Sequence, residues 1–509
     1  MMKRLPFLLA GAAVLCVLAG SILAERPRIY AIKDVRIVVA PGKVVAKGNV
    51  IIRDGLIEAA GANAAIPKDA VEIDGSGKTV YAGLIDAQTT IGLRRAAANA
   101  NAGGGGRGGA AALLAAATPA APTPGANHAI ARIHPELDAR SLLVPFEGEA
   151  PPAAAGGGRG GGGRGGAAAA PAAATTQSDS ERYRAIGFTT VLVEPDSGII
   201  KGESAVINLR DGVPVGDIIV KDHVFQHIQI SAGGGFGGGG GGGGYPGSLM
   251  GIISSIRQAM LDTQRFHTWQ QRYAANPTGL KRPEDSPSFE ALVPVVTGAK
   301  EVMFDTEAAE DILAANRIAN EFHLKAMMGA DADTWELLDR VKATGRSLVL
   351  SAAMPDAPRV TDADDAAEAD TRELRRFVNA PSTAKKLLDA KIPFVISSRG
   401  VRTPTDFPRN VRRMIDAGLP ADEALAKVTT EPAKWLGVDK QMGTVEAGKV
   451  ANLIVTDGDL FGANTHVVRV YVDGVEYIQA PPPPAGRGGQ GGRGGAAPPA
   501  ENQNLGGAK

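Results

Sequence analysis

Short apolar strands alternate with helical segments through most of this sequence, and this alternation limits the possible folds more than any other feature. β-Branched or apolar runs predict strands at residues 188–193, 205–209, 224–230, 302–304, 324–328, 348–350 and 393–397. Apolar residues at helical spacing predict helices at residues 249–273, 307–322, 333–343, 374–390, 408–417 and 421–428. Strands and helices in this order form a parallel sheet, either open or closed into a barrel. We therefore expect an α/β fold.

Both ends of the sequence have strand patterns without intervening helices. Strands are predicted at residues 35–39, 44–52, 56–60 and 79–86, and again at residues 451–456 and 467–472. The dipeptides Asp54-Gly55 and Asp473-Gly474 are typical of tight turns between strands. Strand-rich ends therefore flank an α/β middle segment.

Half of the 66 glycines are confined to four stretches, at residues 103–109, 156–166, 233–244 and 486–495. Elsewhere glycine has its ordinary frequency in globular proteins, and the lack of a three-residue period excludes collagen. We expect low-complexity inserts at about residues 94–180 and 232–248 and a disordered tail at residues 481–509. The first insert, dominated by Ala, Gly and Pro, is predicted to form a long flexible loop that packs no core.

The amino-terminal segment has the pattern of a secretory signal. Lys3 and Arg4 precede an apolar run that ends in small residues before Glu25. We expect residues 1–24 to be a signal peptide and the protein to be secreted or periplasmic. The alternative is an N-terminal membrane anchor, because about 20 apolar residues can span a bilayer. Cys16, the only cysteine, lies in this run, so no disulfide or thiolate ligand is expected after cleavage.

The charge balance selects no polyanionic partner. The chain has 54 basic and 54 acidic residues, so no net field attracts nucleic acid or anionic membranes. Arginines in Arg-Gly-Gly contexts resemble RNA-binding tails, but the aromatic side chains that would stack on bases are lacking there. We therefore expect no nucleic-acid partner.

Three parts of the sequence resemble the amidohydrolase superfamily. Residues 81–92 read Tyr-Ala-Gly-Leu-Ile-Asp-Ala-Gln-Thr-Thr-Ile-Gly and are similar to the family's first barrel strand, Pro-Gly-Leu-Ile-Asp-x-His-x-His. Residues 430–438, 443–455 and 472–474 are similar to its closing segment, and residues 302–338 to the middle of its imidazolonepropionase-like branch. The resemblance implies a (β/α)8 TIM-like barrel with a small β-sandwich formed by both chain ends. It assigns the sandwich to residues 25–82 and 437–480 and the barrel to residues 83–436.

The resemblance also implies zinc or another divalent metal, but the ligand positions have unsuitable side chains. The family's two first-strand histidines correspond to Gln88 and Thr90, which are not usual ligands for such ions. The histidine after the middle strand corresponds to Asp305, which can still bind a metal through oxygen. The last-strand aspartate, both ligand and general base, corresponds to Arg399, whose guanidinium cannot accept a proton. Activation of water by two metal ions is therefore not expected.

Few other residues offer a replacement site. His223 and His227 lie four apart in a predicted strand, too far apart to share an ion easily, and we interpret them as exposed or core-edge residues. The acidic run at residues 362–370 lacks the glycine turn of a calcium loop. Asp86 and Asp305 are the carboxylates expected near the barrel mouth. Alternatively, both residues have structural and not catalytic roles: Asp86 would hold a loop, and Asp305 would cap the next helix.

These observations leave three hypotheses about function. By resemblance, the chain is a hydrolase of C–N bonds other than peptide bonds, acting on cyclic amides or similar small molecules, with a one-metal or metal-free site. The alternative is a non-catalytic subunit that binds a small molecule, as a homo-oligomer or beside an intact amidohydrolase homologue. A structural surface protein built around the glycine tracts is the third. An ion pair between Arg399 and Asp305 would favour the non-catalytic hypothesis, because it would fill the metal space.

Overall fold

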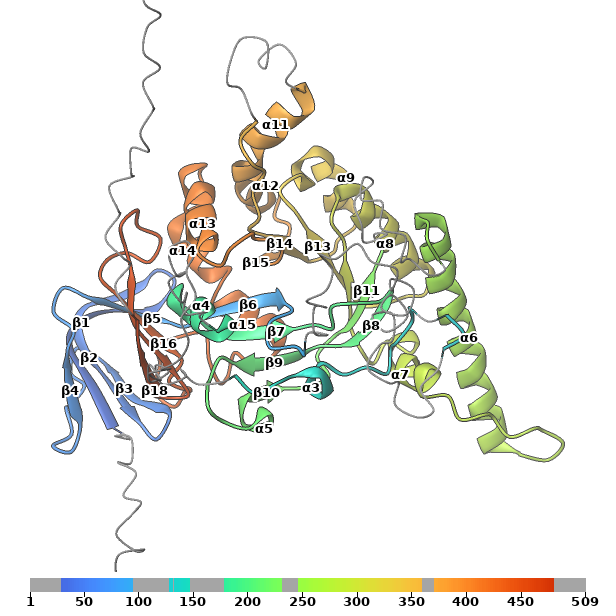
Figure 1. Ribbon diagram of the computed structural model, residues 1–509, viewed down its shortest axis with the longest axis horizontal. Coiled ribbons are helices and arrows are strands. Elements are labelled where there is room, and N and C mark those ends of the chain that lie inside the picture. Colours follow the sequence, from blue (N-terminus) through green and yellow to red (C-terminus); the bar gives the residue numbers. More distant parts are fainter. Residues whose placement is uncertain are drawn as a thin grey trace, which may run out of the picture. The chain divides into compact units, whose positions relative to one another are not determined.

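The computed structural model describes residues 29–94, 128–130, 132–146, 178–230, 246–358 and 370–479, and they form a mixed α/β fold (Figure 1). The expected α/β class is therefore confirmed. The predicted signal peptide, the four glycine-rich stretches and the predicted tail lie outside these residues. Among the residues described, none of the helices is both long and apolar enough to cross a membrane.

Strands from both ends of the chain form one eight-stranded sheet, here called the terminal sheet. Its strands are β1 (Ile29–Ala40), β2 (Lys43–Arg53), β3 (Leu56–Gly61), β4 (Val71–Asp74), β5 (Thr79–Ala82), β16 (Leu453–Thr456), β17 (Val467–Val472) and β18 (Val475–Ile478). The order is β18-β17-β16-β5-β1-β2-β3, with β4 paired to β1. Because β16 pairs antiparallel with β5, the two ends of the described chain are hydrogen-bonded to each other.

The other strands form a four-stranded and a six-stranded sheet. The first has the order β10-β9-β7-β6, and the second has the order β15-β14-β13-β12-β11-β8. Their bounds are β6 (Leu84–Thr89), β7 (Phe188–Val193), β8 (Ile200–Glu203), β9 (Ala205–Asn208), β10 (Ile219–Lys221), β11 (Gln226–Gln229), β12 (Val302–Asp305), β13 (Ala326–Ala330), β14 (Leu348–Ser351) and β15 (Phe394–Ser397). β6 and β7 pair in parallel, as do β11 to β15 in succession, as the alternation predicts. The sequence pattern does not predict β8 and β10. β8 pairs antiparallel with β11, and β10 pairs antiparallel with β9.

Gly83 separates two strands where the sequence predicts one. The apolar run at residues 79–86 leaves the terminal sheet after β5 and continues as β6 in the four-stranded sheet. The Gly83 N–H donates to Asn452 O at 2.8 Å. A Cβ atom at this position would lie 2.1 Å from Thr189 Oγ1, so only glycine fits between the two sheets.

One apolar cluster receives side chains from both α/β sheets. It includes Ile85, Leu192 and Val206 from the four-stranded sheet and Met303, Val349 and Val395 from the six-stranded sheet. Within the described residues, no backbone ladder joins β15 to β6. The Ser398 N–H, directly after β15, instead donates to Asp86 Oδ1 in β6 at 3.1 Å. The edges of the two sheets are thus connected through a side chain.

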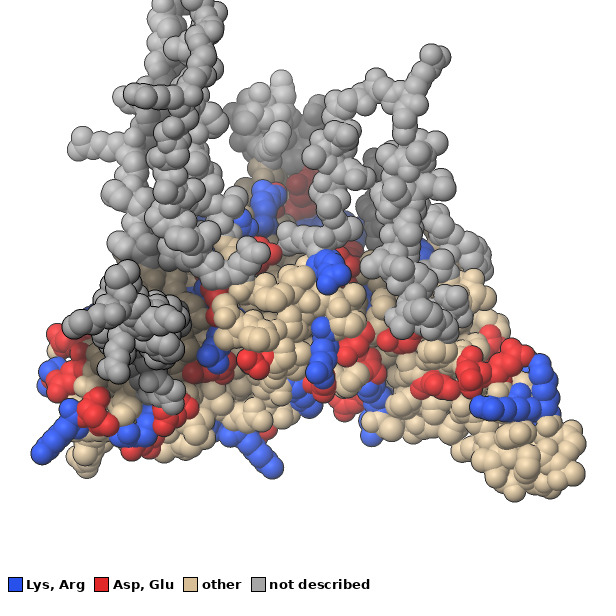
Figure 2. Space-filling view, turned by 60° about the horizontal axis from the view of Figure 1, so that its bottom comes forward, with Lys and Arg blue, Asp and Glu red and all other residues tan. Residues whose placement is uncertain are grey.

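Helices complete the α/β part of the chain. They are α3 (Ala139–Leu142), α4 (Asp179–Ala185), α5 (Val215–Ile218), α6 (Leu249–Ala275), α7 (Pro287–Val296), α8 (Ala309–Glu321), η1 (Thr334–Leu337), α9 (Leu338–Ala343), α11 (Thr371–Asn379), η2 (Ala380–Ser382), α12 (Thr383–Asp389), α13 (Asp406–Asp416), α14 (Ala421–Ala426) and α15 (Thr430–Leu436). The helix predicted over residues 374–390 is divided by η2, where Pro381 lacks a backbone N–H. On the face shown in Figure 2, acidic and basic side chains are interspersed.

The prediction that residues 94–180 pack no core was wrong for residues 132–146. Ile133, Leu143 and Phe146 are buried in the largest apolar cluster of the molecule. Leu143 forms a β-bridge with Leu93, and Ile133 forms one with Ile200. The alanine- and glycine-rich composition on either side concealed this short segment, although it contains a consecutive apolar run, Leu142-Leu143-Val144.

Candidate functional site

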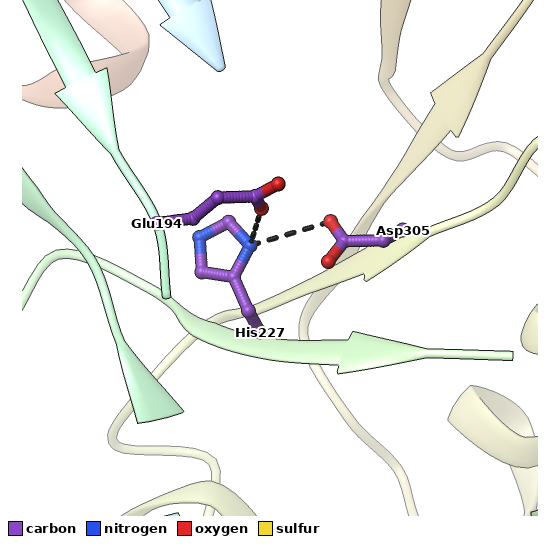
Figure 3. A group of neighbouring side chains, drawn as sticks. All are labelled: Glu194, His227 and Asp305. Carbon is purple, nitrogen blue, oxygen red and sulfur yellow. Dashed lines mark hydrogen bonds and ion pairs between the residues drawn. The ribbon is translucent and has the colours of Figure 1, made fainter. Parts of the chain in front are cut away.

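Three buried side chains from strands of both α/β sheets, or from the residue directly after a strand, meet in the interior of the protein. Glu194 directly follows β7, His227 lies in β11 and Asp305 ends β12. In Figure 3 their side chains point toward one another, and His227 Nδ1 lies 2.5 Å from Glu194 Oε2 and 3.3 Å from Asp305 Oδ1. Their side chains are at most 2% exposed. In the parallel pairing of β11 with β12, His227 lies opposite Met303 and Asp305 lies opposite Gln229. His227 and Asp305 are therefore two positions apart on neighbouring strands, with their side chains on the same face of the sheet.

Two further side chains contact both carboxylates of this group. Lys201, in β8, places its Nζ 2.7 Å from Asp305 Oδ2 and 3.6 Å from Glu194 Oε1. Gln88 Nε2, in β6, donates to Asp305 Oδ1 at 2.7 Å and to Glu194 Oε2 at 3.1 Å. The Lys201 side chain is 3% exposed, so this ammonium is held away from bulk water. The result is a dense, charged cluster in the protein interior.

Arg399 completes the cluster from the end of β15. Its Nη1 lies 3.9 Å from Asp305 Oδ1, and its side chain, 24% exposed, is the most open of the group. Gly329 lies beside it, and a Cβ there would touch Arg399 Nη1 at 3.5 Å and clash with Thr306 O at 2.8 Å. Among the described residues, the Arg399 guanidinium has no hydrogen-bond partner. Its donors are thus available to a ligand.

The protonation states follow from the charges. Burial acts to lower the pKa of His227, but the carboxylates of Glu194 and Asp305 outweigh it and raise this pKa to about 9. Burial acts to raise the pKa of Asp305, but Lys201, His227 and Arg399 hold it well below the usual range. The pKa of Lys201 is raised by the same two carboxylates against the effect of burial. At neutral pH, three cations therefore face two carboxylates, and the formal charge of the cluster is positive.

With Lys201 and Arg399 beside Asp305, the cluster does not fit the divalent ion that the resemblance implies. Glu194, His227 and Asp305 are suitable ligand types, and one ligand atom of each lies within 4.8 Å of the others. However, the His227 proton and the Lys201 ammonium already use the carboxylate oxygens. Another two positive charges would enter a cluster that has an excess of positive charge, at a high cost in the protein interior.

Asp86 belongs to a separate group of hydrogen bonds. Ser398 donates to it through both its N–H, at 3.1 Å, and its Oγ, and the Gln88 N–H donates at 3.2 Å. The Tyr183 hydroxyl lies 3.1 Å from Ser398 Oγ. Asp86 is fully buried, and burial raises its pKa to about 6. These contacts hold the loop after β15 against β6, which agrees with the structural alternative for this residue.

The structure brings together some of the residues singled out in the sequence. Gln88, Asp305 and Arg399 converge, and the ion pair that we named as a discriminator is present. Thr90 is exposed and lies outside the cluster. Asp305 does not cap α8, because Asp311 Oδ2 accepts the Ala308 N–H there. That alternative was wrong.

Two residues of the cluster, Glu194 and Lys201, were missed, and a third, His227, was singled out but misinterpreted. The interpretation of His227 as an exposed or core-edge residue was wrong, since it is fully buried in the cluster. His223 lies in a turn with positive φ, and its Nδ1 contacts Glu203. A usable signal was Glu194 directly after a predicted strand, where functional residues of parallel sheets gather. The acidic run at residues 362–370 lies outside the described residues apart from Asp370, whose side chain caps α11.

Comparisons with known proteins agree with this fold. A family model described as the amidohydrolase family matches residues 305–477. Amidohydrolase tasK of Hapsidospora irregularis is 32% identical over 106 residues, which are 21% of this chain and 11% of that protein. The N-substituted formamide deformylase of Arthrobacter pascens is 44% identical over 66 residues, 12% of each protein. The chain thus matches about a tenth of the length of these curated relatives.

A solved structure covers far more of the chain. The crystal structure of an amidohydrolase from Thermotoga maritima MSB8 has a TM-score of 0.62 and 22% sequence identity, covering 88% of this chain and 100% of that one. This similarity concerns the fold, and the family match concerns the sequence of the carboxyl-terminal part. Residues 305–477 thus match the amidohydrolase family in sequence, and most of the chain shares its fold with a solved amidohydrolase.

Proposed function

We propose that this protein binds a small amide or related C–N compound at the carboxyl ends of its barrel strands, and that it does not hydrolyse this compound through a metal-activated water. The observation that carries the proposal is the contact of Lys201 Nζ with Asp305 Oδ2 at 2.7 Å. The Lys201 ammonium pairs with the Asp305 carboxylate, which would otherwise be free to bind a metal ion or to accept a proton. The match of residues 305–477 to the amidohydrolase family supports the class of ligand, because the resemblance to that family implies hydrolysis of C–N bonds.

The proposal includes a barrel and a sandwich. We infer that the two α/β sheets form a (β/α)8-like barrel within residues 83–436, and that residues 25–82 and 437–480 form a β-sandwich. The shared apolar cluster of the two sheets and the hydrogen bond from Ser398 to Asp86 support closure between β15 and β6. In such barrels the carboxyl ends of the strands form the binding face. The cluster around Asp305 would then line the floor of that face.

Arg399 would provide the main polar contact with the ligand. It is the most exposed cation of the cluster, and its guanidinium has no hydrogen-bond partner among the described residues. A guanidinium prefers carboxylate or carbonyl oxygens and can bind a carboxylate through two parallel hydrogen bonds. We therefore expect a ligand with a carboxylate near its amide group.

Replacing Arg399 tests this contact. Arg399→Met should weaken binding of a carboxylate-bearing amide by at least tenfold, because a charge-assisted hydrogen bond contributes about 1.5–3 kcal/mol. Isothermal titration of the full-length protein against amides and lactams, with and without a carboxylate, measures the effect. Arg402→Met is the matched control, since Arg402 is exposed and pairs with Asp356. Equal affinities of native protein and Arg399→Met would contradict this role.

Metal content and turnover test the non-hydrolytic part of the proposal. We expect the purified protein to contain less than stoichiometric metal and to release no product from the same amides and lactams. Stoichiometric zinc, together with turnover that Asp305→Ala abolishes, would overturn the proposal in favour of a metal-dependent hydrolase. Turnover without metal that depends on Asp86 or Asp305 would instead favour the metal-free hydrolase.

Export is proposed as well. The basic start, apolar run and small residues of residues 1–24 support it. Fractionation of cells that express the full chain, with amino-terminal sequencing, distinguishes a cleaved periplasmic or secreted protein from an anchored one. Co-purification with an intact amidohydrolase homologue would support the scaffolding alternative.

A further inference from the structure

We propose that Glu194, His227 and Asp305 form a latent site for a divalent transition-metal ion, which the ammonium group of Lys201 keeps closed. The inference concerns metal binding alone and does not depend on the proposed ligand. It assigns to Lys201 the role of an internal cation that replaces the metal.

The three side chains have the chemistry and the proximity of a metal site. Two carboxylates and an imidazole are a suitable donor set for zinc and cobalt. Their ligand atoms lie within 4.8 Å of one another. An ion with bonds of about 2.1 Å holds two ligand atoms at most about 4.2 Å apart, so small side-chain rotations would complete the site.

The carboxylates are already held in place by a neutral side chain. Gln88 Nε2 donates to Asp305 Oδ1 at 2.7 Å and to Glu194 Oε2 at 3.1 Å. Such hydrogen bonds to ligating oxygens orient them in known metal sites. They do not depend on Lys201, so they would remain after its replacement.

Lys201 is the group that closes this site. Its Nζ lies between the two carboxylates, at 2.7 Å from Asp305 and 3.6 Å from Glu194. An ion bound to both carboxylates would lie within a few ångströms of this ammonium, and repulsion at that distance in a buried site is severe. Arg399 is farther away, at 3.9 Å from Asp305, and partly exposed, so its charge is better screened by water.

Lys201→Met removes the ammonium and keeps an unbranched side chain of similar length. We expect the full-length variant to bind one equivalent of Co²⁺, detected by visible d–d absorption, at least ~100-fold more tightly than the native protein. Lys201→Met/Asp305→Asn should return to the native level. Lys300→Met is the matched control, because Lys300 pairs with Glu203 outside this cluster and should leave Co²⁺ binding unchanged.

Several results would overturn the proposal. One is a folded Lys201→Met protein that binds Co²⁺ no more tightly than the native chain, and another is one equivalent bound by the native chain itself. Lys201→Gln, which keeps a hydrogen-bond donor near Asp305, is the second variant if Lys201→Met does not fold. Refolding of either variant by Zn²⁺ in an Asp305-dependent manner supports the proposal, and failure of both to fold with Zn²⁺ counts against it.

Discussion

At the scale of single residues, Lys201 and His227 determine the character of the buried cluster. Both lie on strands, and neither position belongs to the motifs by which the sequence resembles the amidohydrolase superfamily. The motifs identify Gln88 and Asp305, and the structure brings these together. They cannot identify Lys201, because β8 is a short antiparallel strand outside the regular alternation. The partners of a buried charge come from segments far apart in sequence, so local patterns do not reveal them.

The raised pKa of His227 predicts a loss of stability in alkaline solution. Its folded-state pKa of about 9 lies above the ordinary value of about 6.5, so its contribution is complete below about pH 6.5 and is lost as the pH rises through 9. Over this range, the free energy of unfolding should fall by on the order of 3 kcal/mol. His227→Gln should remove that fall.

Chemical denaturation at several pH values measures this difference. His466→Gln is the control, because His466 is half-exposed beside Asp457. Parallel pH profiles for the native protein and His227→Gln would show that the buried imidazole is not charged at neutral pH.

At the scale of elements, the junction between β15 and β6 depends on Asp86. Most strands of the α/β part were predictable from sequence, since β7, β12, β14 and β15 consist mainly of apolar and β-branched residues. The junction between β15 and β6 was not predictable, because hydrogen bonds from Ser398 to the Asp86 carboxylate take the place of a backbone ladder there. The place of Asp86 in the motif at residues 81–92 is compatible with either a catalytic or a structural role. Only its buried contacts favour the structural role.

Asp86 predicts a second pH effect. Its folded-state pKa of about 6 lies above the ordinary value of about 3.9, so its contribution is complete below about pH 4 and is lost as the pH rises to 6. Asp86→Asn imitates the protonated carboxyl group, and at pH 7.5 it should exceed the native protein in stability by on the order of 2 kcal/mol. Urea denaturation at pH 4.5 and 7.5 tests this.

Asp389→Asn, at an exposed helical pair with Lys385, is the control for Asp86→Asn and should change stability little at either pH. A variant Asp86→Asn that is less stable than the native protein at pH 7.5 would indicate that the ionised carboxylate is needed at the junction.

At the scale of the whole molecule, a polar network joins the terminal sheet to the α/β part. The Asn452 side chain donates to Thr190 Oγ1 at 3.1 Å and to Asn208 Oδ1 at 3.0 Å, and it accepts the Asp473 N–H at 2.8 Å. Asn208 Nδ2 in turn donates to Asp473 Oδ1 at 2.6 Å. The resemblance implied that both chain ends associate, but it gave no indication of this network. Its members come from four separate segments of the chain.

Asn452→Ala should lower the free energy of unfolding by about 3 kcal/mol, because three hydrogen bonds of its side chain, two of them buried, are lost at about 1 kcal/mol each. Tryptophan fluorescence reports on the α/β part, which contains Trp269, Trp335 and Trp435, and hydrogen exchange reports on the terminal sheet. Both should show one coincident transition in the native protein. Asn276→Ala, at an exposed helix end, is the control, and separate transitions in the native protein would show that the network does not couple the two parts.

The cluster around Asp305 also has a consequence for biogenesis. Its positive charges belong to Lys201, His227 and Arg399, which are covalently part of the chain. Proteins with a metal centre must acquire their ion from a cellular supply, and their maturation slows when that supply is short. Here the neutralising charge is synthesised together with the carboxylates. Under the proposed function, the buried carboxylates of this cluster therefore need no ion from the surroundings to balance their charge.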